Sequence, residues 1–212
     1  MKIFIDFDDV LFNTKKFKDD YLEVFAAYGI SKEVFERFYY DPQSVGGIKK
    51  YDPIRHIGRI FKKEKEIGKN LEKSVMDFVS DTSRYVFPDV TGFLKKFRKE
   101  ELFIVSYSLT DFQKAKISNS GIGDFFKAIE IGSELKEKAV AGLIDREGID
   151  LSKENVYFIE DRISHIESVK RKYPVIRTIL LKRKEGRYAD GKNELCDFEV
   201  ENLEQAEKII LR

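Results

Sequence analysis

The sequence predicts an α/β fold, in which a parallel β-sheet forms the core and a helical segment is inserted into it. Two observations lead to this class. Short apolar runs of strand length alternate with segments whose apolar residues recur at helical spacing. One long stretch, residues 15–84, has helical periodicity and contains no convincing strand pattern.

Five apolar runs are expected to form the strands, because each is short and almost continuously apolar, as is typical of strands covered on both faces. They are residues 2–7 (KIFIDF), 102–107 (LFIVSY), 127–131 (KAIEI), 155–160 (NVYFIE) and 176–181 (IRTILL). Between the first two runs, segment 90–97 repeats apolar residues at spacings of three, four and seven, which predicts a helix with one buried face. Strands that alternate with helices in this way form parallel sheets.

Residues 15–84 are expected to form a helical cap that interrupts the core after its first strand. The first apolar stripe of this stretch covers residues 17–28 and is followed by Gly29, a residue that commonly ends a helix. Further stripes cover residues 34–38, 57–61 and 71–79. We therefore expect residues 1–14 and 85–212 to form the α/β core and residues 15–84 to form the cap.

The composition limits the possible partners and the compartment. The chain has 212 residues, 42% of them hydrophobic, and its 39 Lys and Arg residues nearly balance 38 Asp and Glu residues. A net charge of +1 does not indicate a nucleic-acid partner. No apolar run approaches the roughly 20 residues that span a bilayer, so no membrane partner is expected. The single cysteine, Cys196, excludes an internal disulfide and, with the charged start of the chain, favours the cytoplasm.

Polar side chains follow several of the predicted strands at the point where each strand ends. Asp6 and Asp8 follow the first run, Ser106 ends the second, and Glu160 and Asp161 end the fourth. Ligands of open α/β sheets bind at the carboxyl ends of the strands, so these side chains are expected to meet. Carboxylates that converge repel one another unless a hard cation such as Mg²⁺ binds them. A serine hydroxyl and a lysine ammonium, from Lys136 or Lys138 after the third run, suit a phosphate dianion.

In this order, the segments resemble the four signatures of the haloacid dehalogenase-like (HAD) hydrolases. The first signature is similar to residues 3–11 (IFIDFDDVL), the second to 104–106 (IVS), the third to a lysine that opens a helix, and the fourth to 158–161 (FIED). Residues 85–90 (YVFPDV) are similar to the family's return from cap to core. The resemblance covers nearly the whole chain and implies a Rossmann-like core with a helical C1-type cap, as in subclass I of the family.

The resemblance also implies a role for each residue in a Mg²⁺-dependent phosphatase. Asp6 attacks the phosphorus and forms an aspartyl-phosphate, while Asp8 protonates the leaving oxygen and then activates the water. The Mg²⁺ ligands are Asp6, the backbone carbonyl of Asp8, and Asp161. Ser106 hydrogen-bonds the phosphoryl oxygens. Lys138, preferred over Lys136 because Leu143 and Ile144 follow it at the family's apolar spacing, balances the negative charge.

One position departs from the family pattern. Many members carry a second aspartate four residues after the fourth-signature aspartate, and here His165 stands in that position. Glu160 either supplies the missing metal ligand or is an ordinary surface residue. Lys136 and Lys138 lie among other charged residues, so a solvated helix face is an alternative for both of them.

Several functions of the same fold stay open at this point. A 2-haloacid dehalogenase needs the nucleophile but not a second acid, so Asp8 favours a phosphatase. A phosphomutase uses the same residues, and a non-catalytic phosphate-binding homologue is the alternative that His165 raises. The substrate is expected to be a small-molecule phosphate ester of undetermined class, and the oligomeric state is undetermined.

The cap is expected to be a mobile lid that excludes water from the site and determines specificity. Its aromatic and basic residues include candidates for contact with a phosphorylated substrate, although most of the aromatic ones are expected to pack inside the cap. They are Phe38, Tyr39, Tyr40, Lys49, Lys50, Tyr51 and Arg55.

Overall fold

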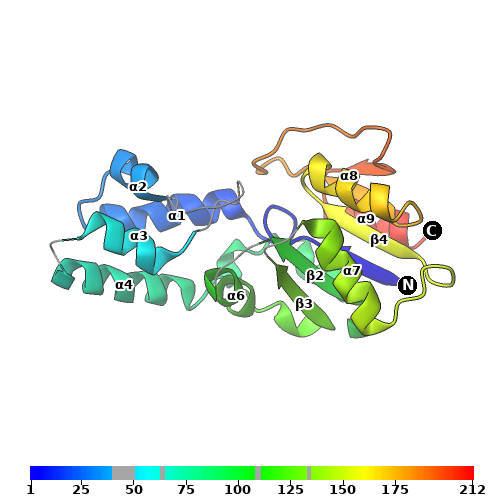
Figure 1. Cartoon of the computed structure of the whole chain (residues 1–212), viewed down its shortest axis with the longest axis horizontal. Coiled ribbons are helices and arrows are strands. Elements are labelled where there is room, and N and C mark those ends of the chain that lie inside the picture. Colours follow the sequence, from blue (N-terminus) through cyan, green and yellow to red (C-terminus); the bar gives the residue numbers. More distant parts are fainter. Residues whose placement is uncertain (40–50, 63–64, 108–110, 133–134) are drawn as a thin grey trace.

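The fold is a six-stranded parallel sheet with helices on both faces and a helical lobe at one end (Figure 1). The structure is a computed structural model that describes residues 1–39, 51–62, 65–107, 111–132 and 135–212. The strands are β1 (Lys2–Ile5), β2 (Leu102–Tyr107), β3 (Ala128–Gly132), β4 (Val156–Glu160), β5 (Arg177–Leu181) and β6 (Phe198–Val200). Their order in the sheet is β3-β2-β1-β4-β5-β6, which confirms the Rossmann-like α/β class.

The central strand of this sheet, β1, is paired on both sides. Ile5 lies beside Ile104 of β2 on one side and beside Ile159 of β4 on the other. Every residue of β4 is buried, as the continuously apolar sequence of that strand predicts. Because β1, β2 and β4 are parallel and in register, their carboxyl ends lie at the same edge of the sheet, where the polar side chains begin.

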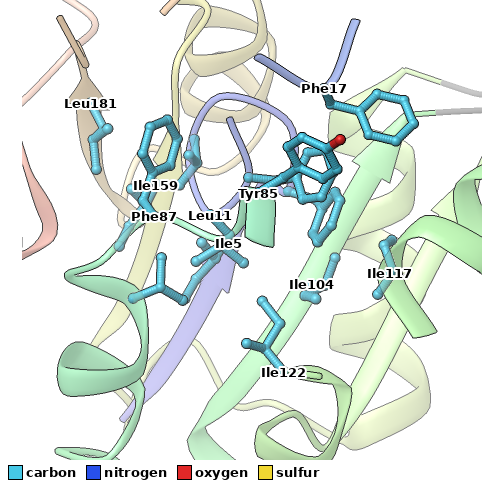
Figure 2. Close-up of a cluster of buried hydrophobic side chains, with 14 of the residues drawn as sticks. Ile5, Leu11, Phe17, Tyr85, Phe87, Ile104, Ile117, Ile122, Ile159 and Leu181 are labelled. Carbon is cyan, nitrogen blue, oxygen red and sulfur yellow. The ribbon is translucent and has the colours of Figure 1, made fainter. Parts of the chain in front are cut away.

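The two faces of the sheet are covered by different helices. Phe4, Phe103 and Phe158 share a hydrophobic cluster with residues of α7 (Lys136–Glu147) and α8 (Ile163–Lys172). The isoleucines of the opposite face pack with residues of α5 (Val90–Leu94) and α9 (Leu203–Ile210). Figure 2 shows this second cluster, with Ile5, Ile104 and Ile159 on neighbouring strands and Leu11 and Phe87 beside them. Successive residues of β1, β2 and β4 thus point to opposite faces of the sheet and pack against different helices.

Between β1 and α5, the regular elements that the structure describes in residues 14–85 are all helices, as the sequence predicts. The helices are α1 (Thr14–Ala26), α2 (Lys32–Tyr39), α3 (Pro53–Ile60) and α4 (Lys65–Val79), followed by a short 3₁₀ helix, η2 (Ser83–Tyr85). In Figure 1 the four α-helices form the lobe at the left, away from the sheet. The Asn13 side chain caps α1 by accepting a hydrogen bond from the Lys16 amide at 2.9 Å. The exact division at residues 15–84 stays a prediction.

The remaining elements complete the layers. They are α6 (Asp111–Ser118), which follows β2, and the short 3₁₀ helices η3 (Lys99–Glu101) and η4 (Gly123–Phe125). Residues 90–97 were expected to be one helix, and α5 ends earlier, at Leu94. The edge strand β6 was not predicted, because three residues carry too little of an alternating pattern to be recognised. Among the described helices, none has the length and apolarity needed to cross a membrane.

Strand β1 is shorter than predicted, and the difference shapes the site. It ends at Ile5, and the next residues fold into a tight turn in which the amides of Leu11 and Phe12 both donate to the carbonyl of Phe7 at 3.0 Å. Asp9 has a φ of +59°, in the left-handed region where aspartate is among the few tolerated side chains. This turn sends Asp6 and Asp8 off the end of the strand.

Candidate active site

The polar residues expected at the strand ends do converge at the carboxyl edge of β1, β2 and β4. Asp6 keeps its backbone in the sheet, because its amide donates to the carbonyl of Ile159 at 2.9 Å. Asp6, Ser106 and Asp161 are only 6%, 2% and 7% exposed, and Glu160 is fully buried. Such a concentration of buried carboxylates is costly unless cations compensate it.

Lys136, the first residue of α7, supplies one of these cations. Its ammonium nitrogen lies 2.6 Å from Asp6 Oδ1 and 3.1 Å from Glu160 Oε2. It also donates to the backbone carbonyl of Val105 at 2.6 Å, and the residue is 2% exposed. The ammonium therefore connects the ends of all three central strands.

The expectation of Lys138 at this position is wrong, because Lys138 lies on the exposed face of α7. Two residues along a helix point to different sides, so only one of the two lysines can face the site. The buried residues of α7 are Lys136, Val140, Leu143 and Ile144. The three apolar residues follow Lys136 at helical spacing. Val140 distinguishes the two lysines, because it follows Lys136 by four residues and Lys138 by only two.

The carboxylates around Lys136 differ in their affinity for protons. Burial and the nearby charge of Glu160 raise the pKa of Asp6 well above its ordinary value, and Lys136 only partly offsets this. Burial also acts to raise the pKa of Glu160, but the Lys136 ammonium and His165 outweigh it and hold that pKa well below the usual range. Glu160 is therefore the ionised partner of Lys136.

Asp6, Glu160 and Asp161 fit a divalent cation. Each offers a carboxylate oxygen, and the three oxygens lie within 4.8 Å of one another. Asp161 Oδ2 is buried and accepts no hydrogen bond from any residue that the structure describes. Burial and the charge of Glu160 raise the pKa of Asp161 to about 11. An oxygen-lined cluster that cannot hold all its negative charge is the environment that a hard cation stabilises.

His165, which replaces the aspartate of the family pattern, lies at this same cluster. Its Nδ1 is 3.2 Å from Glu160 Oε2. Glu160 also accepts from the backbone amides of Asp161 and Arg162 at 3.2 and 3.3 Å. These contacts fix Glu160 as a buried member of the cluster, so the alternative that it is a surface residue is wrong.

Asp8 has hydrogen-bond partners different from those of the three-carboxylate cluster. Its Oδ1 accepts hydrogen bonds from Thr14 Oγ1 and Lys116 Nζ, both at 2.7 Å, and its Oδ2 accepts from Gln113 Nε2 at 2.8 Å. Burial acts to raise the pKa of Asp8, but the charges of Lys116 and Arg187 prevail and hold it well below the usual range. The metal ligand expected from Asp8 is its backbone carbonyl, and that role stays a prediction.

Gln113 and Lys116 on α6 were not predicted from the sequence. Both are 5% exposed, and Gln113 Nε2 also reaches Ser106 Oγ at 3.0 Å, so it joins the second strand end to Asp8. Polar residues three apart that face inward interrupt the apolar stripe of α6. That interruption, directly after the predicted second strand, was the available signal, although a surface helix gives the same pattern.

The long connection between β5 and β6 adds arginines that the sequence did not indicate. Arg187 forms an ion pair with the fully buried Asp9. Arg183 anchors the connection, because its guanidinium lies 2.9 Å from Asp89 Oδ1 and donates to the carbonyl of Val10 at 2.8 Å. The segment thus lies against the turn that follows β1.

The cap aromatics mostly pack against one another, as expected. The rings of Tyr39 and Tyr51 stack with centroids 4.1 Å apart. His56 Nε2 lies 3.0 Å from the carbonyl of Phe35, which can only accept, so Nδ1 accepts from the Tyr51 hydroxyl at 3.2 Å. Burial lowers the pKa of His56 to about 4 and keeps it neutral.

The other cap candidates lie at the surface or outside the described structure. Phe38 is half-buried and Arg55 is exposed. Tyr40, Lys49 and Lys50 lie outside the described residues.

Comparison with known proteins gives a family and a fold. The sequence model of a family described as haloacid dehalogenase-like hydrolase matches residues 3–175. No curated protein matches the chain in sequence.

Solved structures that resemble this one span nearly the whole chain. YfnB of Bacillus subtilis, a HAD-type protein bound to magnesium, has a TM-score of 0.62 at 14% identity and covers 99% of this chain and 97% of its own. A Clostridium difficile protein assigned as a phosphatase has a TM-score of 0.61 at 17% identity, with 98% and 97% covered. The L-2-haloacid dehalogenase of Xanthobacter autotrophicus has a TM-score of 0.61 at 14% identity, with 99% and 98% covered. At such identities the likeness establishes the fold alone.

Proposed function

This chain belongs to the haloacid dehalogenase-like hydrolases, and we propose that within this family it is a magnesium-dependent phosphatase of a small-molecule phosphate monoester. The observation that carries the proposal is the pair of aspartates with opposite environments. Asp6 lies beside Lys136 and the three-carboxylate cluster, whereas Asp8 is held separately by Thr14, Gln113 and Lys116. Two carboxylates with two different environments suit a nucleophile and an acid–base group.

The first half of the proposed reaction transfers the phosphoryl group to Asp6. An oxygen of the Asp6 carboxylate forms a bond to phosphorus as the bond from phosphorus to the ester oxygen breaks. Asp8 gives its proton to the departing oxygen. In the substrate-free protein Asp8 is ionised, but a phosphate dianion bound nearby raises its pKa, because like charges favour the protonated form.

The second half of the reaction hydrolyses the aspartyl-phosphate. Asp8, now a carboxylate, takes a proton from a water molecule whose oxygen attacks the phosphorus, and the bond between phosphorus and Asp6 breaks. In both halves the hydroxyl of Ser106 donates to a phosphoryl oxygen. The ammonium of Lys136, which is held by Asp6, Glu160 and the Val105 carbonyl, balances the negative charge. The hydrogen bond from Gln113 to both Ser106 and Asp8 keeps the two groups at a fixed separation.

A magnesium ion would be held by Asp6, Asp161 and Glu160, with the backbone carbonyl of Asp8 as a further ligand. Bound there, it supplies positive charge that offsets both the carboxylates and the phosphoryl oxygens. The buried Asp161 oxygen without a hydrogen bond from the described residues supports this assignment.

The environment of Asp8 favours a phosphatase over a dehalogenase. Halide departs as a stable anion and needs no proton, whereas an alkoxide leaving group does. Three side chains orient Asp8, two of them from α6, and a dehalogenase has no use for such an arrangement.

A phosphate-release screen over many phosphate monoesters, with Mg²⁺, Mn²⁺ or Co²⁺ present, tests the proposal. We expect release that EDTA abolishes and that Asp6→Asn abolishes while the fold, followed by circular dichroism, is retained. No release from any ester with any of the three ions would refute the phosphatase assignment. Halide release from a 2-haloacid in place of phosphate release would establish the dehalogenase alternative.

A further inference from the structure

Lys18 lies on α1, the helix that contacts Asp8 through Thr14. Thr14 donates to Asp8 at 2.7 Å, and Lys18 follows Thr14 by four residues on α1. Residues four apart lie on the same face of a helix. The face of α1 that meets Asp8 therefore also carries Lys18. Because Asp8 protonates the leaving oxygen, the rest of the leaving group extends past Asp8 toward this face.

Lys18 is a half-buried cation without an ion pair in the described part of the chain. Its ammonium lies over the ring of Tyr39, 5.8 Å from the ring centroid. Burial lowers the pKa of Lys18, and the positive charges of Arg187 and Lys116 add to this effect, while Asp8 opposes it. A partly desolvated ammonium among like charges is unfavourable unless an anion joins it.

The carboxylates near Lys18 are already committed to other partners. Both oxygens of Asp8 accept hydrogen bonds from Thr14, Gln113 and Lys116. Asp9 is paired with Arg187. By contrast, Lys116 and Lys136 each have a carboxylate within 2.7 Å, so Lys18 differs from the other buried or half-buried lysines of the site.

Space for a ligand adjoins Lys18. A cavity of about 430 Å³ opens between α1 and α2, and Lys18, Leu22, Phe35 and Tyr39 are among the residues that line it. Of its other charged residues, Lys32 and Glu36 form an ion pair with each other at 3.9 Å, and Asp19 is exposed. Lys18 is thus the cavity residue that connects this space to Asp8, because the charge of Asp8 acts to raise the pKa of Lys18.

From these observations we infer that Lys18 recognises a second anionic group on the substrate, so that the preferred ester carries a carboxylate or a second phosphate on its leaving group. This inference rests on the proposed phosphatase function and narrows its substrate class. The anion joins Lys18 when the ester binds, and no bond to it is made or broken. A neutral leaving group of the same shape leaves Lys18 without its partner.

Matched pairs of esters test the inference on the full-length protein with Mg²⁺. The first pair is phosphoglycolate and its uncharged amide, and the second is propane-1,3-diol bisphosphate and propyl phosphate. For the wild type we expect the charged member of one pair to have a kcat/KM about 10- to 100-fold higher, the usual strength of a hydrogen bond to a charged group. The pair that shows the preference identifies the anion as carboxylate or phosphate.

Variants of neighbouring lysines assign the preference to a residue. Lys18→Met is expected to bring the ratio of the charged to the uncharged ester close to one, and Lys18→Arg to retain most of it. Lys15→Met, which removes an exposed lysine of the same helix, is expected to leave the ratio unchanged. Calorimetric titration of Asp6→Asn with the charged ester, with and without Lys18→Met, measures binding independently of turnover.

The outcomes separate this inference from the function on which it rests. Hydrolysis of the esters with no preference in either pair, or a preference that survives Lys18→Met, would overturn the role of Lys18 and leave the phosphatase standing. Absence of phosphate release from every ester would refute the phosphatase itself. In that case, Lys18-dependent binding to the Asp6→Asn variant would still support an anion site, and its absence would overturn both.

Discussion

Replacement of Asp161 by Asn should stabilise the metal-free protein, because the site holds more negative charge than its cations balance. The pKa of Asp161 is raised from its ordinary value of 3.8 to about 11. In the folded state the group therefore keeps a proton at neutral pH that it loses on unfolding. Its ionisation favours the unfolded state, and Asp161→Asn removes that contribution.

The sign and size of the effect follow from proton linkage. A carboxyl group with a raised pKa contributes stability below its unfolded pKa and loses it as pH rises from there through the folded pKa. Over the neutral range the loss is about 1.4 kcal/mol for each pH unit. Summed from the unfolded pKa of 3.8 up to pH 7, the loss of stability due to Asp161 has an upper limit of about 4 kcal/mol. We expect Asp161→Asn to recover about 1 to 4 kcal/mol, since the amide also changes local hydrogen bonding.

Urea unfolding in EDTA between about pH 7 and pH 8 measures this effect. The free energy of unfolding of the wild type should fall more steeply with pH than that of Asp161→Asn. Comparing the two proteins cancels the contributions of all other titrating groups. Addition of Mg²⁺ should then stabilise the wild type and have little effect on the variant, because a ligand that binds only the folded state stabilises it. Equal pH slopes, together with equal stabilisation by Mg²⁺, would refute the assignment of Asp161 to a cation site.

Further predictions concern the cations of the site and one histidine of the cap. Lys136→Met should lower kcat/KM by roughly 10²- to 10³-fold and destabilise the fold by about 3 to 5 kcal/mol, because two buried carboxylates lose their partner. Lys138→Met should have little effect on either quantity. A larger loss of kcat/KM at Lys138 in steady-state assays would reverse the assignment. Lys116→Met should lower kcat by about 10²-fold for esters with alkyl leaving groups, because Lys116 holds the Asp8 carboxyl in place by a hydrogen bond. The loss should be much smaller for nitrophenyl phosphate, whose leaving group needs no proton, and equal losses with both esters would mean that Lys116 does not orient Asp8 as an acid. Because the pKa of His56 is about 4 in the folded protein, the contribution of this histidine to stability is fully present above about pH 6.5 and falls below it. The wild type should therefore lose about 2 to 3 kcal/mol more of its free energy of unfolding than His56→Leu between pH 6.5 and 4. Parallel curves of stability against pH would contradict this.

The features that local sequence encodes were predictable. Asp6, Ser106 and Asp161 each end a continuously apolar run, and parallel strands bring such ends to one edge. The helices of the insertion were equally visible, because an amphipathic helix repeats its apolar residues every three or four positions. These two periodicities were sufficient to predict the fold class and the meeting of these side chains at one edge of the sheet.

The features that depend on tertiary contacts were not predictable. Gln113 and Lys116 reach Asp8 only because α6 returns across the end of β2. Arg187 reaches Asp9 across a sequence separation of 178 residues, from a connection without periodicity. A buried cation looks like a surface cation in sequence, because its burial depends on the carboxylate that it meets.

The choice between Lys136 and Lys138 lies between these two cases. The two lysines are only two residues apart, so the positions of Leu143 and Ile144 alone do not decide which lysine lies on the buried face. Once Val140 is included, the buried face of α7 begins at Lys136.

The central claim, that Asp6 carries the phosphoryl group during turnover, is tested most directly by trapping that intermediate. The protein is mixed with Mg²⁺ and a phosphate monoester that it hydrolyses, quenched in acid within milliseconds to seconds, and examined by intact-mass and peptide mass spectrometry. We predict one added phosphoryl group on the peptide that contains Asp6, formed no more slowly than phosphate is released and absent from Asp6→Asn. Phosphate release at full rate without this adduct, or a phosphoryl group on another residue, would contradict the account.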